Sequence, residues 1–147
     1  ITDSMDSDLG IEVRNYYGAK TNKFFNCSEG DVIKKIIESK KYLAILPVKG
    51  DWWKKDIPLD VNVFGALPIV NEKPLGFLLG QVTNEKARRN KTVIVYEKKN
   101  KEMINKKYRV EILDSSDILE FGIIDGYFQS FEDFDISILG SYGYINP

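Results

Sequence analysis

Apolar and charged positions recur at helical spacing between residues 28 and 39. One face of the predicted helix carries four aliphatic side chains, and lysines with a glutamate fill the other; the aliphatic residues are Val32, Ile33, Ile36 and Ile37. Ser28 is placed to cap this run, and Asp31 stands in the capping-box position. The pattern predicts an amphipathic helix that ends near Ser39.

Shorter apolar runs predict β-strands along the rest of the chain. They span residues 11–17, 42–48, 61–70, 75–82, 92–97 and 108–113, and two more lie between residues 118 and 142. The run 42–48 is continuous and directly follows the helix. This favours a buried strand, parallel or central in its sheet, that Pro47 closes.

Polar segments separate these elements. Residues 1–10 are acidic and predict a flexible terminus or linker, and residues 83–91 predict an exposed loop or hairpin tip. The lysine-rich stretch 98–107 predicts a helical or looped crossover. The order of elements indicates an α/β or α+β fold, a mixed β-sheet with few helices.

The composition argues against several classes of function. The chain has 147 residues, 43% hydrophobic and 29% charged, which suits one domain or two small ones. Its net charge of −1 gives no general attraction to nucleic acid, and its apolar runs are too short to span a membrane. The glycines show no phosphate-binding spacing, which argues against nucleotide hydrolysis and dinucleotide binding.

The sequence contains no histidine and one cysteine, Cys27. The missing histidine removes the commonest general base and most zinc sites. A single cysteine excludes an internal disulfide and favours a cytoplasmic setting. We therefore expect no metal and no cofactor. The chain opens at Ile1 rather than at a methionine, which we interpret as a processed chain or a fragment.

Several short motifs resemble one family. The run Leu-Gly-Ser-Tyr at residues 139–142 follows a strand, an acidic crossover and a second strand, and resembles the end of the regulatory ACT domain of prephenate dehydratases. Leu46-Pro47, Asp51-Trp52-Trp53 and Ala66-Leu67-Pro68 add a resemblance to a domain behind the helical catalytic domain of some bacterial chorismate mutases.

This resemblance implies an architecture. Residues 11–91 would correspond to a prephenate-dehydratase lobe, and residues 92–147 to a degenerate ACT-like, ferredoxin-like part, as two units or one continuous domain. It also implies partners: an aromatic amino acid, an upstream helical catalytic domain, and a second copy in a homodimer. No nucleic acid or membrane partner is expected.

The chain departs from the family where catalysis would lie. The Thr-Arg-Phe triplet of the dehydratases is absent, and residues 83–85 read Thr-Asn-Glu after Val82. An arginine-lined helical mutase core is also absent from the predicted elements. The ACT ligand motifs are replaced by Lys-Asn-Lys-Glu at residues 99–102 and Leu-Asp-Ser-Ser at residues 113–116. We predict no catalytic residues in this chain.

Nine residues are candidates for a ligand site, and each has a structural alternative. Trp52 and Trp53 could line an aromatic pocket, or they could cover a core edge or an interface. Arg88 and Arg89 could clamp a carboxylate or be solvated in a polar loop. The others lie at strand ends and could contact a ligand or shape turns and strand ends: Asp125, Gly126, Gly140, Ser141 and Tyr142.

The sequence thus predicts a non-catalytic regulatory or ligand-binding domain of a chorismate-mutase/prephenate-dehydratase-type protein in aromatic amino-acid biosynthesis. The alternative is a structural dimerisation or packing module without a small-molecule ligand. A third hypothesis is a stand-alone enzyme that uses carboxylates and lysines.

Overall fold

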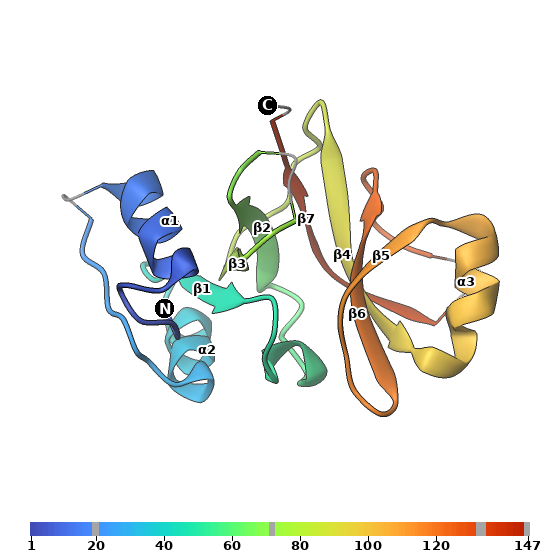
Figure 1. Ribbon diagram of the computed structural model, residues 1–147, viewed down its shortest axis with the longest axis horizontal. Helices are drawn as coiled ribbons and strands as arrows, with labels where there is room; N and C mark the ends of the chain where they lie inside the picture. Colours follow the sequence, from blue (N-terminus) through green and yellow to red (C-terminus); the bar gives the residue numbers. More distant parts are fainter. Residues whose placement is uncertain (19–20, 71–72, 132–134, 146–147) are drawn as a thin grey trace.

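The computed structural model of the protein describes residues 1–18, 21–70, 73–131 and 135–145 (Figure 1). Its helices are α1 (Asp8–Tyr17), α2 (Glu29–Glu38) and α3 (Lys101–Lys107), with short 3-10 turns η1 (Trp52–Lys54) and η2 (Lys98–Asn100). Its strands are β1 (Ala44–Pro47), β2 (Asn62–Leu67), β3 (Gly76–Gly80), β4 (Asn90–Glu97), β5 (Val110–Ser115), β6 (Leu119–Asp125) and β7 (Ile136–Gly143).

All strands of the described residues join one mixed sheet in the order β1-β3-β2-β7-β4-β6-β5. Neighbouring strands are antiparallel except β2 and β7, which run parallel and meet at one register pair, Val63 and Gly140. The predicted α+β class, a mixed sheet with few helices, is confirmed.

The C-terminal strands follow a ferredoxin-like order. β4, α3 and β5 form a split βαβ unit, because β6 lies between the two strands and pairs antiparallel with both. β7 then returns along the other edge of β4. The connection from β6 to β7 holds no helix in its described residues, which therefore show one of the two helices of such a unit, α3.

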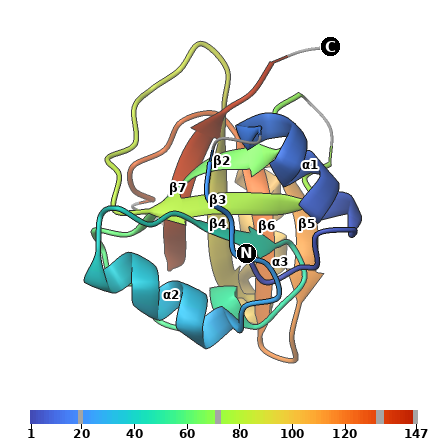
Figure 2. The ribbon, with the colours of Figure 1, turned by 90° about the vertical axis from the view of Figure 1, so that its left-hand side faces the viewer.

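The two parts distinguished in the sequence, residues 11–91 and 92–147, share this sheet. β7 belongs to the second part and pairs with β2 of the first. Figure 2 shows β2 and β3 running across the direction of β4, β6 and β7, so the sheet curls. The largest core cluster fills its concave side and takes side chains from both parts, including Trp52, Phe77, Phe121 and Tyr142.

Helices pack against both faces of the sheet. α2 contributes Val32 and Ile36 to the largest cluster. α1 packs Leu9 and Val13 on the opposite face of β1 and β3. Farther along the chain, α3 places Ile104 on the outer face of β4 and β6.

The predicted amphipathic helix at residues 28–39 is confirmed as α2. The Ser28 hydroxyl accepts a hydrogen bond from the backbone N–H of Asp31 at 3.2 Å, as its capping position requires. Val32 and Ile36, one turn apart, are buried, and Ile37 is exposed.

The predicted strand at residues 11–17 is wrong, because this segment lies in α1. The helix begins at Asp8, inside the stretch 1–10 expected to be a flexible terminus or linker, and Ser7 caps it. The buried side chains, Leu9 and Val13, are four residues apart, which is helical spacing. β-Branched and aromatic residues after Gly10 misled the strand prediction, and Tyr16 is in fact exposed.

The strand predicted at residues 42–48 exists as β1, but its predicted position is wrong. β1 is an edge strand that pairs only with β3, in antiparallel orientation. It is apolar on both faces because Leu46 points into the main core and Ile45 packs with α1. Two-sided burial here comes from helices on both faces and not from a central place in the sheet.

Candidate functional site

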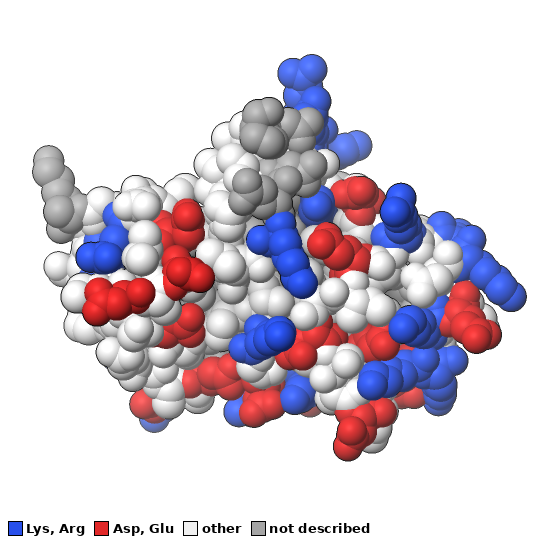
Figure 3. Space-filling model, in the orientation of Figure 1, with Lys and Arg blue, Asp and Glu red and all other residues white. Residues whose placement is uncertain are grey.

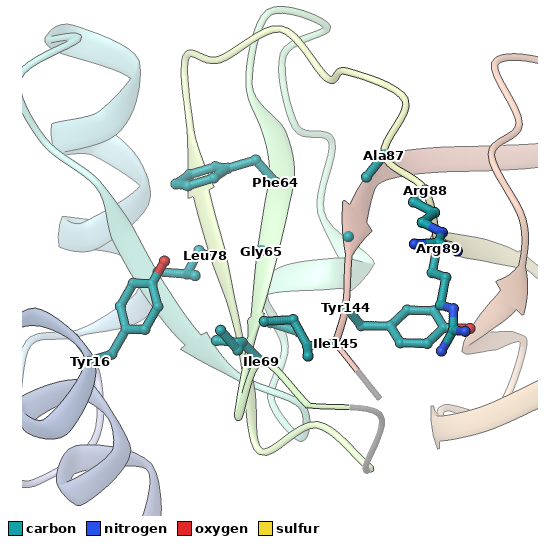
Figure 4. Close-up of a pocket in the computed structure, with 12 residues that line it drawn as sticks. Tyr16, Phe64, Gly65, Ile69, Leu78, Ala87, Arg88, Arg89, Tyr144 and Ile145 are labelled. Carbon is teal, nitrogen blue, oxygen red and sulfur yellow. The ribbon is translucent and has the colours of Figure 1, made fainter. Parts of the chain in front are cut away.

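A groove of about 610 Å³ lies on the outer face of β2 and β3, between α1 and the end of β7 (Figure 4). Aromatic and aliphatic side chains from distant parts of the chain line it: Tyr16, Phe64, Ile69, Leu78, Tyr144 and Ile145. Ala87, Arg88, Arg89 and Gly143 complete the wall at the end of β7. The volume lies within the usual range for small-molecule sites.

A β-bulge shapes the floor of the groove. The register between β2 and β3 shifts between Val63 and Gly65, so Phe64 is the extra residue. Gly65 packs tightly, since an added Cβ would lie 2.5 Å from Leu78 Cδ1. Bulges re-aim side chains at sites in this way, and here Phe64 extends over the groove (Figure 4).

The loop that carries the two arginines is held at both ends by asparagines. The Asn90 Oδ1 accepts a hydrogen bond from the Ala87 N–H at 2.8 Å, and its Nδ2 donates to the Ala87 carbonyl at 3.1 Å. The Asn84 amide bonds to Val63 and Ser141, at 2.9 Å each. These hydrogen bonds anchor the backbone of the loop. The side chains of Arg88 and Arg89 are exposed on it.

Arg88 and Arg89 are the predicted site residues that line this groove. Residues 83–89 form the expected loop, with side chains largely exposed, and β4 begins at Asn90. Two guanidinium groups beside apolar walls can bind a ligand with a carboxylate and a ring.

Trp52 and Trp53 lie elsewhere, in the main core. They are 1% and 2% exposed, which leaves no surface for a ligand. Trp53 stacks on Phe121 at a centroid distance of 5.2 Å, and Trp52 Nε1 donates to the Pro47 carbonyl at 2.7 Å. The alternative expectation was that the pair covers a core edge or an interface; both side chains instead lie inside the main core.

Gly140 and Ser141 lie where β7 meets its neighbouring strands β2 and β4. Gly140 has φ of 145°, and an added Cβ would lie 2.1 Å from the Val63 carbonyl oxygen, so the close approach of β2 and β7 requires glycine. The Ser141 hydroxyl is buried and lies 2.9 Å from the Thr92 hydroxyl. Neither residue lines the groove.

Tyr142, Asp125 and Gly126 are also separate from the groove. Tyr142 is buried in the main core, and this burial, followed by the nearby charges of Glu111 and Asp125, raises its pKa above the usual value. The Gly126 N–H bonds to the Asn90 carbonyl at 2.8 Å in the turn after β6. Asp125 lines a different hollow with Lys91 and Arg109.

The groove residues that the sequence did not reveal are Tyr16, Phe64, Ile69, Tyr144 and Ile145. The one available signal was Gly65, since a lone glycine inside a strand pattern indicates a bulge. Tyr16 was assigned to a strand, and its helical position places it at the groove wall.

No group of three or more acidic, cysteine or histidine side chains in the described residues is placed to hold a metal ion. Nor does the described part of the chain contain a helix with the length and apolarity to cross a membrane. The Cys27 thiol donates weakly to the Phe24 and Phe25 carbonyls, at 3.6 and 3.7 Å, away from the groove.

Comparisons with known proteins add no relative. No family model matches the sequence, and neither the curated proteins nor the solved structures gave a significant match.

Proposed function

We propose that this chain is a non-catalytic, cytoplasmic regulatory domain that binds an aromatic amino acid in the groove between α1 and β7. The observation that carries the proposal is the pairing of aromatic and aliphatic walls with two arginines on one anchored loop. The chain motifs that resemble prephenate dehydratases and chorismate mutases support an aromatic ligand and a parent enzyme of that type.

The groove chemistry defines how such a ligand would bind. Its ring would pack on Phe64, Ile69 and Ile145, which removes apolar surface from water. Its carboxylate would meet Arg88 or Arg89, because a guanidinium presents paired donors that match the two carboxylate oxygens.

Regulation would follow from the elements that the groove joins. Tyr16 belongs to α1 near the start of the chain, whereas Tyr144 follows β7 near its end (Figure 4). A ligand that contacts both favours the arrangement in which they face each other. Binding can shift a parent enzyme's activity only through such differential affinity for two states.

A specific observation also favours the second candidate, a dimerisation module. β5 is an edge strand, and the two isoleucines Ile112 and Ile118 on and beside it are 37% and 68% exposed. An open strand edge with apolar neighbours can pair with another copy. This role needs no ligand.

Thermal unfolding with L-phenylalanine and L-tyrosine tests the first candidate. A ligand that binds only the folded state raises Tm, and about 100 times Kd of ligand stabilises by about 2.7 kcal/mol. We expect Arg88→Ala/Arg89→Ala to abolish the shift. Arg88→Lys/Arg89→Lys should weaken it, because lysine keeps the charge but loses the paired donors.

The matched control is Lys98→Ala/Lys99→Ala, which removes two positive charges at η2 and should leave the shift unchanged. No Tm shift at millimolar ligand would contradict the proposal. If sedimentation then showed a dimer that Ile112→Asp dissociates, the dimerisation module would replace it.

A further inference from the structure

A second hollow, of about 390 Å³, lies at the ends of β4, β5 and β6. Two cations and two anions line it, Lys91, Arg109, Glu111 and Asp125, with Val110 and Ile123 as its apolar surface. Figure 3 shows acidic and basic side chains interspersed over the half of the molecule that holds these strands. The hollow shares no lining residue with the groove.

Strand register brings the charged groups together. Lys91 lies opposite Asp125 on β6 and opposite Tyr142 on β7. Glu111 lies opposite Ile123, two residues before Asp125. Directly paired residues share a face of the sheet, and so do residues two apart on one strand. Lys91, Glu111 and Asp125 therefore project from the same face.

The Lys91 ammonium is only weakly paired. Its side chain is 13% exposed, and the nearest carboxylate oxygen, of Asp125, is 4.0 Å away. Its other contact is the face of the Tyr144 ring, 5.2 Å from the centroid. No hydrogen bond joins this ammonium to another described residue. The ammonium therefore keeps donors that an anionic group in the hollow can accept.

The two carboxylates of the hollow are also weakly paired. The Lys91 ammonium is 4.0 Å from a carboxylate oxygen of Asp125, and no ion pair joins Glu111 to another described residue. Both acidic side chains are exposed. The hollow therefore combines two basic groups and two carboxylates that a ligand can reach.

We propose that this hollow binds a small zwitterion of the free α-amino-acid class. The ligand carboxylate is held by Lys91 and Arg109, and its ammonium by Glu111 and Asp125. An anion alone would lie beside two carboxylates, and a cation alone beside two basic groups. Only a ligand with both charges complements the four groups, and the limited apolar surface favours a short side chain.

Amide chemical shifts of the full chain in NMR titrations test this site. L-alanine is the zwitterionic probe, and acetate and ethylamine are the single-charge probes. We expect saturable shifts at residues 91, 109, 111 and 125 with L-alanine and none with either single-charge probe. Lys91→Gln and Glu111→Gln should each weaken the apparent Kd about tenfold or more, the usual scale of one charge-assisted contact.

The control variants are Lys99→Gln and Glu102→Gln, exposed residues outside the hollow, which should leave the titration unchanged. Glu111 is itself exposed, so its substitution keeps the test valid if Lys91→Gln fails to fold. Equal shifts with acetate, or L-alanine shifts that Glu111→Gln leaves intact, would overturn the proposal. Retained L-alanine binding in Arg88→Ala/Arg89→Ala separates this site from the groove.

Discussion

Asn84 and Ser141 are joined by a hydrogen bond that stands in for backbone pairing between two strands. The Asn84 Oδ1 accepts the Ser141 N–H at 2.9 Å, and the Nδ2 of the same amide donates to the Val63 carbonyl at 2.9 Å. β2 and β7 share only one register pair at this junction. The side-chain amide thus links the N-terminal and C-terminal parts of the sheet where ladder bonds end.

Asn84→Ala should destabilise the protein by about 1–3 kcal/mol, because it leaves a part-buried donor and acceptor unpaired. Asn84→Asp should also destabilise it, since a carboxylate cannot donate to the Val63 carbonyl. Urea unfolding measures the free-energy change. Thr83→Ala, one residue earlier and exposed, is the control and should stay within about 0.5 kcal/mol. Equal stability of Asn84→Ala and the control would contradict the linking role.

Gly140→Ala should cost more than about 3 kcal/mol, since it adds a Cβ at a positive φ and against backbone. That Cβ would lie 2.1 Å from the Val63 oxygen. Gly30→Ala is the matched control, and we expect its effect on the free energy of unfolding to have the opposite sign. Nothing lies within 4 Å of its added Cβ in α2, so it should stabilise by roughly 0.5–1 kcal/mol. Urea midpoints of the two variants, measured side by side, check both signs.

The parts of the fold that local pattern determines could be predicted from the sequence. α2 has strong periodicity and a serine cap, and both signals agree. α1 was missed because its apolar spacing, Leu9 to Val13, begins inside an acidic stretch that resembles a tail. Strand order could not be predicted, since it depends on contacts between distant segments such as β2 and β7.

The residues of the candidate site also fall into those that local sequence indicates and those that depend on distant contacts. Arg88 and Arg89 could be singled out because arginines are few in this chain and these two adjoin in a polar loop. The burial of Trp52 and Trp53 depends on Phe121, far along the chain, whose ring meets theirs. Tyr16 and Tyr144 lie at opposite ends of the sequence, so no local pattern could indicate that they line one groove.

The adjacent tryptophans should respond differently to removal of the indole N–H. Trp52 Nε1 donates to the Pro47 carbonyl, whereas Trp53 Nε1 is buried and has no hydrogen-bond partner among the described residues. Trp52→Phe therefore loses a bond and leaves a carbonyl unpaired, whereas Trp53→Phe also removes an unsatisfied donor. We expect Trp52→Phe to cost about 1–2 kcal/mol more than Trp53→Phe in urea unfolding. Equal losses of stability in the two variants would indicate that the lost ring volume alone determines the cost.

Alkaline pH should destabilise the protein through buried tyrosines. Burial is the main cause that raises the pKa of Tyr17, to about 12, and it also raises those of Tyr96 and Tyr142. In the unfolded chain these phenols ionise near pH 10. Above that pH the folded state binds more protons than the unfolded state, so stability falls as pH rises toward the folded pKa. Below about pH 10 both states are protonated, and these groups add no pH dependence.

Urea midpoints followed from about pH 9 to 11 measure this loss, and tyrosinate absorbance reports the late ionisation. Tyr17→Phe and Tyr142→Phe should each flatten the decline, because the group whose ionisation opposes folding is gone. Tyr42→Phe is the control, since Tyr42 is 42% exposed, and should keep the wild-type slope. The same slope in all three variants would show that the decline comes from groups other than these buried phenols.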